Sequence, residues 1–79
     1  PNPAIDASSL RFFLDKPGDV QITVFDVNGK VALSRREFGV PGLNEVALST
    51  GTLSAGLYQI RVMSDNQTVG TKSWLITRN

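Results

Sequence analysis

The sequence predicts an all-β protein that folds as an antiparallel β-sandwich of roughly six or seven short strands. Apolar and polar residues alternate with a period of two in several short segments, which is the pattern of half-buried strands. Clusters of glycine, proline, asparagine, aspartate and serine separate these segments at intervals of roughly 8 to 12 residues. No segment shows the apolar period of about 3.6 residues that an amphipathic helix requires.

The expected strands follow from this alternation. They cover residues 9–14, 20–27, 30–38, 43–49, 57–63 and 68–77. The second is the most regular, and its residues Val20, Ile22 and Val24 are predicted to face the core. Residues 34–37 are polar and charged, so the third strand is expected at a sheet edge. Alternation in the last strand is irregular over residues 73–76, where we expect a β-bulge.

The turn after the second strand has two possible builds. Both use Asp26, Asn28 and Gly29 as turn residues. In the first build, Asn28 and Gly29 form the centre of a two-residue type I′ turn, and Val24 pairs with Leu33.

In the second build, Asp26 begins a type I turn and Gly29 adopts a left-handed conformation. This build creates a bulge and pairs Phe25 with Val31. We favour it slightly, because the Asp26 carboxylate can then accept hydrogen bonds from nearby backbone amides.

Composition excludes several kinds of site. The 79 residues contain neither histidine nor cysteine, and eight basic residues face seven acidic ones. Without histidine, the commonest general base and metal ligand are missing, and without cysteine no disulfide can form. A net charge of +1 with no basic face gives no indication of nucleic-acid binding. No apolar run approaches the roughly 20 residues of a membrane helix.

The carboxylates do not indicate catalysis. They lie mostly in turns or at outward strand positions, and a small sandwich has little depth for a carboxylate pair about 5 to 10 Å apart across a cleft. The spacing from Asp26 to Glu37 slightly resembles a calcium loop, but Lys30 stands where an oxygen ligand is required. We therefore expect a non-catalytic domain with no cofactor, no metal and no small-molecule substrate.

Several apolar residues have a specific expected place. Phe13 occupies an outward position in the first strand, so we expect it to contact a second layer, an adjoining domain or a binding partner. Leu53 is expected to anchor the loop before the fifth strand. Tyr58 alternates with core residues and is predicted to be buried with its hydroxyl hydrogen-bonded. An accessory carbohydrate-binding module remains an alternative function, and it predicts Trp74 exposed beside a second aromatic residue.

Five short motifs occur in order along the chain. They are Pro-Asn-Pro at 1–3, Phe-Asp-Val-Asn-Gly-Lys at 25–30, Gly-Leu-Asn-Glu-Val-Ala-Leu at 42–48, Leu-Ser-Ala-Gly-Leu-Tyr-Gln-Ile-Arg-Val at 53–62 and Thr-Lys-Ser-Trp-Leu-Ile at 71–76. This ordered set covers essentially the whole chain and resembles the type A C-terminal sorting domain of type IX (Por) secretion cargo. That family combines a Pro-Asn-Pro opening, an aromatic-Asp-x-x-Gly-Lys/Arg turn, a Leu-x-x-Gly-x-Tyr strand start and a lysine-containing last strand.

The resemblance implies a single immunoglobulin-like sandwich of about seven strands over residues 1–79, not catalytic itself and located at the C-terminus of a larger secreted protein. It implies three partners: a cargo domain N-terminal to it, the secretion translocon, and a sortase-like surface protease that removes the domain while the cargo is attached to lipopolysaccharide. The implied location is outside a Gram-negative bacterium or on its surface, after transit through the periplasm. Because the chain opens with Pro1 rather than methionine, we expect it to be an excised piece.

The resemblance also associates translocon recognition with the last strand and tail. The matching residues here are Gly70, Lys72, Trp74, Leu75, Ile76 and Arg78. Ser73 and Trp74 stand where a second lysine and a smaller apolar residue are common in the family. Strand addition to this segment is a recognition mode that its sequence permits.

A structural role is a further alternative. The immunoglobulin-like domain of flagellar hook-capping proteins is similar in its aromatic-Asp-x-x-Gly-Arg/Lys turn and its Gly-x-Tyr strand. Those domains commonly have a Trp-Asp-Gly segment between the two motifs, whereas residues 46–49 here are Val-Ala-Leu-Ser. The sorting domain is therefore the closer resemblance.

Overall fold

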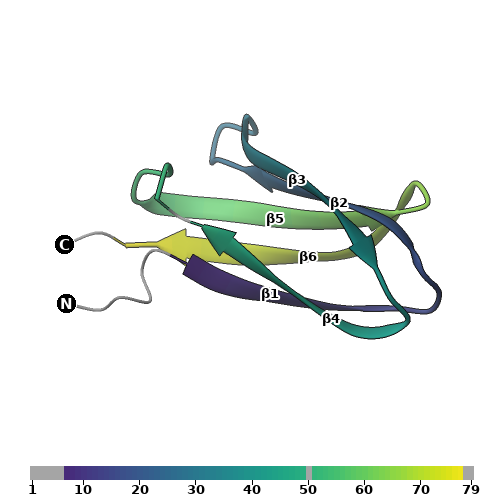
Figure 1. Cartoon of the computed structure of the whole chain (residues 1–79). Helices are drawn as coiled ribbons and strands as arrows, with labels where there is room; N and C mark the ends of the chain where they lie inside the picture. The colour runs from purple at the N-terminus through teal and green to yellow at the C-terminus, as the bar shows by residue number, and fades with distance from the viewer. Residues whose placement is uncertain (1–6, 50, 78–79) are drawn as a thin grey trace.

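The computed structural model describes residues 7–49 and 51–77. These residues form six strands (Figure 1). The strands are β1 (Ala7–Leu14), β2 (Gly18–Phe25), β3 (Val31–Gly39), β4 (Gly42–Ser49), β5 (Gly56–Ser64) and β6 (Gln67–Ile76). Every pairing is antiparallel, so the predicted antiparallel β-sandwich is confirmed, with six strands in the described part of the chain. Those same residues contain no helix that is long and apolar enough to cross a membrane.

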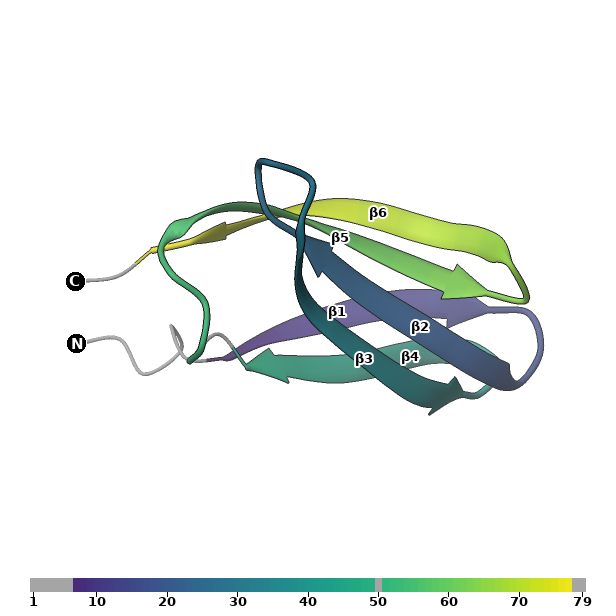
Figure 2. The same cartoon turned by 90° about the horizontal axis from the view of Figure 1, so that it is seen from above.

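The strands divide into two layers (Figure 2). β1 and β4 form a two-stranded sheet, and the other sheet has the order β3-β2-β5-β6. β3 and β6 are therefore the edge strands of the larger sheet, which confirms the edge position predicted for β3. β1 lies beside β6 and contacts it (Figure 1).

The core lies between the two sheets. Val20, Ile22 and Val24 are completely buried, as their alternation predicts. The buried apolar side chains are Leu10, Phe12, Leu14, Val20, Ile22, Val24, Leu48, Leu53, Tyr58, Ile60, Val62 and Ile76. Burying one aliphatic or aromatic side chain of this size contributes about 1.5–3 kcal/mol. A chain without cysteine depends on this burial for its stability.

The turn between β2 and β3 has the second of the two builds. The Gly29 N–H donates to the Asp26 carbonyl at 3.0 Å, and Gly29 has a φ of 81°. The Asp26 carboxylate also accepts hydrogen bonds from the backbone N–H groups of Asn28 at 2.8 Å and Lys30 at 3.0 Å. The aspartate therefore satisfies three turn amides, two through its side chain and one through its carbonyl.

The register of this hairpin changes once near the turn. Phe25 pairs with Val31, whereas Val24 pairs with Leu33. Ala32 is the extra residue between these two pairs, so a β-bulge lets both registers occur in one hairpin.

The bulge in β6 does not lie over residues 73–76, so that prediction is wrong. β6 pairs regularly with β5 from its C-terminal end to Gly70, and the extra residue is Val69. Polar and apolar residues do not alternate cleanly in β6, because the charged Lys72 lies on the inward side of the strand and the apolar Leu75 on the outward side. β6 is an edge strand, so the long side chain of an inward-facing lysine still reaches solvent.

Tyr58 ties the loop before β5 to the core. Its side chain is buried, and its hydroxyl donates a hydrogen bond of 2.7 Å to the Ser54 carbonyl. Leu53 is buried under the same loop. Both predictions are confirmed, and they explain the Leu-x-x-Gly-x-Tyr spacing, because the leucine and the tyrosine enter the core from the two ends of one turn. A tyrosine that bonds back to the loop in this way recurs in β-sandwiches.

Candidate functional site

β6 presents an open edge. It is the last strand in the order β3-β2-β5-β6. One row of its backbone N–H and C=O groups therefore faces no partner strand among the described residues. Such a row can accept an added strand from another protein. β6 also contains most of the residues that the sequence suggested for recognition.

On the outward side of β6, Leu75 is 67% exposed. It forms a cross-strand pair with Leu57 of β5, which is 51% exposed. Two adjacent exposed leucines make a small apolar patch, and such patches can serve as contact sites. A second exposed pair, Phe13 and Leu43, lies on the outer face of the two-stranded sheet.

Two of the suggested residues belong to the core. Ile76 is buried. Trp74 is half-buried and packs against the buried core, and its ring centroid lies 6.5 Å from that of Tyr58. Since Tyr58 is buried, these rings do not form the exposed aromatic pair that a sugar-binding platform requires. Arg78 lies outside the described residues.

The remaining suggested residues line a small groove between β1 and β6. Its volume is about 140 Å³. Apolar side chains from β1 and β5 line it, namely Leu10, Phe12, Ile60 and Val62. Gly70 leaves it open, because a Cβ atom at this position would meet no atom within 4 Å. Lys72 and Arg11 also border it.

The opposite side of the sandwich, between β3 and β4, is bridged by a side chain. The Arg35 guanidinium donates a hydrogen bond of 2.8 Å to the Ala47 carbonyl of β4 and pairs with the Glu37 carboxylate. The Arg35 side chain therefore ties the β3 edge of the larger sheet to β4.

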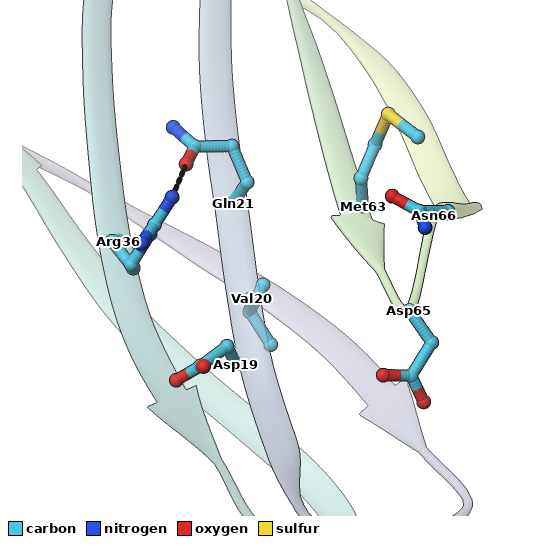
Figure 3. A pocket seen from close by; sticks show the side chains of 7 residues that line it. All are labelled: Asp19, Val20, Gln21, Arg36, Met63, Asp65 and Asn66. Carbon is cyan, nitrogen blue, oxygen red and sulfur yellow. Dashed lines mark hydrogen bonds between the residues drawn. The ribbon is translucent and has the colours of Figure 1, made fainter.

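A second hollow, of about 460 Å³, lies on the larger sheet near the turn between β5 and β6 (Figure 3). Arg36 donates a 3.4 Å hydrogen bond to Gln21 there, while Asp19 lies on β2 and Asp65 in the turn between β5 and β6. No group of three or more acidic, histidine or cysteine side chains that could hold a metal occurs in residues 7–49 and 51–77. The hollow is broad and open, and its side chains assign it no particular ligand.

These features define a small all-β domain in which β6 has an open strand edge. The chain belongs to the secretion system C-terminal sorting domain family, whose family model matches residues 1–77. This confirms the resemblance to the type IX sorting domain and identifies a C-terminal secretion signal rather than a member of a catalytic family. A search of curated proteins and a search of solved structures each returned no match.

Leu57 was not among the residues suggested by the sequence, although it forms the exposed pair with Leu75. The sequence feature that could have located the partner of Leu75 is the turn at Asp65 and Asn66. In the structure these two residues have positive φ values of 52° and 61°, as in a two-residue type I′ hairpin turn. If residue pairs are counted outward from that turn without a bulge, Leu75 is paired with Gly56. The true partner is Leu57, because the bulge at Val69 shifts the register by one residue.

Proposed function

We propose that this domain directs a secreted cargo to the type IX translocon, and that β6 provides the surface that the translocon recognises. The cargo precedes the domain in a larger protein and crosses the outer membrane of a Bacteroidetes-type bacterium. A sortase-like protease then removes the domain at the cell surface, and the cargo is attached to lipopolysaccharide. The match of the sorting-domain family to residues 1–77 is the observation that supports this function most directly.

The open edge of β6 supports the choice of this strand within the domain. Leu75 is exposed on it and is available to a partner, whereas Ile76 is buried. Deleting residues 75–79 would therefore remove a core side chain together with the surface. A point substitution at Leu75 separates recognition from folding, because an exposed side chain contributes little to the core.

The test is export of a reporter. The reporter carries a signal for transfer to the periplasm and is fused in front of residues 1–79 in a bacterium with a working type IX system. Leu75→Ser is expected to lower the reporter outside the cell several-fold and to leave it in the periplasm. Phe38→Ser is the matched control, because Phe38 is 70% exposed and lies on β3, the other edge strand. Its export is expected to equal that of the parent.

Thermal unfolding of each purified domain checks that both variants are folded. Equal export of Leu75→Ser and the parent would show that the outward side of β6 is not recognised. Loss of export in Phe38→Ser alone would move the recognition surface to β3.

A further inference from the structure

We propose that the groove between β1 and β6 binds an extended segment of the secretion machinery, which pairs with the open edge of β6, inserts one apolar side chain beside Gly70 and places a carboxylate next to Lys72. This inference rests on the proposed function, since it names the kind of partner that the same strand binds. It differs in the side of β6 that it uses, which is the inward side rather than the side of Leu75.

The groove has the size of one side chain. Its volume of about 140 Å³ is close to that of an apolar cavity of about 150 Å³ that accepts a benzene-sized group. It is well below the roughly 300 Å³ at which small-molecule pockets begin. Ile60 and Val62, which line it, are 4% and 3% exposed. A leucine, isoleucine or phenylalanine side chain would therefore meet apolar atoms of the core.

Gly70 makes this space reachable from the edge. It lies opposite Val62, so its missing side chain would point into the groove. A strand added to β6 would place one of its own inward-facing residues about 4.5–5.5 Å from this position. That neighbouring residue could fill the space that Gly70 leaves empty, while its backbone hydrogen-bonds to β6.

Charge specifies the partner further. Lys72 lies two residues after Gly70, on the same side of β6, and makes no ion pair with any residue in the described ranges. Arg11 also borders the groove. Its guanidinium forms an ion pair with the Glu45 carboxylate at 3.5 Å on the outer face of the sheet of β1 and β4. A partner strand with an apolar residue and, two positions away from it, an aspartate or glutamate matches both the space and the charge.

A second copy of this chain fits the groove less well. Antiparallel pairing of two β6 strands about their middle would bring Lys72 close to Lys72 of the other copy. Like charges that face each other across a strand pair are destabilising.

The first test fills the groove from within. Gly70→Leu is expected to lower export of the reporter fusion by about tenfold and to leave the melting temperature equal or higher, because glycine weakens a strand. The control Ala47→Leu adds the same side chain at an exposed position on β4 and is expected to export normally. Export of Gly70→Leu at the parent level would overturn the groove as a binding site while the sorting function stands. Failure of the unsubstituted fusion to leave the cell would instead overturn the proposed function.

The second test uses the 79-residue chain and a synthetic peptide. In the peptide, threonine alternates with valine, except that one valine is replaced by leucine and the valines on both sides of it by glutamate, so that a carboxylate reaches Lys72 in either strand direction. Binding is expected to shift the backbone amide NMR signals of residues 70–72, and Gly70→Leu and Lys72→Glu are each expected to weaken it about tenfold. A matched peptide with lysine in place of glutamate is expected to prefer Lys72→Glu over the parent.

Absence of peptide binding to the parent, or equal binding to Lys72→Glu, would contradict the proposal. The oligomeric state of the parent chain, measured by sedimentation, tests whether a second copy of the chain occupies the groove instead. A dimer that Gly70→Leu converts to a monomer would assign the groove to a second copy and overturn the proposal.

Discussion

At Gly39 the two sheets approach so closely that no side chain fits. A Cβ atom here would overlap Leu14 of β1 and lie 3.1 Å from the Val20 side chain of β2. Gly39→Ala is therefore expected to lower the free energy of unfolding by about 1–3 kcal/mol, the usual cost of overpacking a core. Urea denaturation of the purified domain measures this loss.

The control for this prediction is Gly18→Ala. The nearest atom to a Cβ at Gly18 is the Ser64 hydroxyl oxygen at 3.9 Å, which is an ordinary contact. Its free energy of unfolding is expected to stay within about 0.5 kcal/mol of the parent. Equal stability of Gly39→Ala and Gly18→Ala would show that the sheets can separate at Gly39 without cost.

Asn44 shows how a buried polar residue is accommodated beside Gly39. Its side-chain oxygen accepts a 2.9 Å hydrogen bond from the Val40 N–H, and its side-chain nitrogen donates to the carbonyls of Val40 at 2.8 Å and Gly42 at 3.1 Å. A buried amide with these three bonds avoids the cost of an unpaired polar group. The side chain fixes the chain where it crosses from one sheet to the other.

At the scale of elements, the hairpin of β2 and β3 depends on the left-handed conformation of Gly29. Its φ of 81° is unfavourable for residues with a branched side chain. Gly29→Val is expected to lower the free energy of unfolding by about 1 kcal/mol or more. Gly29→Asn is the control and is expected to lose less, because asparagine adopts this conformation more readily. The hairpin assignment would be contradicted if Gly29→Val melted no lower than the parent.

Most of the strands could be predicted from the sequence, because each has one face in the core. Each predicted strand begins and ends within two residues of the observed one. The inward positions of β2 were also predictable, since Val20, Ile22 and Val24 alternate with polar residues. Periodicity of two is sufficient for this, because it depends only on neighbours along the chain.

The bulge and the groove could not be predicted in the same way. The bulge at Val69 changes the register of β6 without changing its composition, so the exposed pair of Leu57 and Leu75 could not be derived by counting from the turn. Gly70 was a suggested site residue through the family resemblance alone. Its role in opening a groove depends on the order of the sheets, which places β1 beside β6.

At the scale of the whole molecule, the two long sides of the sandwich are different. Arg35 connects β3 to β4 on one side, whereas the other side has the open edge of β6 and the groove beside β1. β1 begins and β6 ends at the same end of the sandwich (Figure 1). A cargo attached in front of β1 would therefore emerge at that end, and the part of β6 around Gly70 would remain accessible along the side.

This domain is expected to be sufficient to direct a cargo out of the cell through the type IX system. The most direct measurement compares a periplasmic reporter with and without residues 1–79 at its C-terminus, in a strain with the translocon and in one that lacks it. The reporter is expected at the cell surface or in the medium only when both the domain and the translocon are present. Equal release without the domain, or from the strain that lacks the translocon, would contradict the claim.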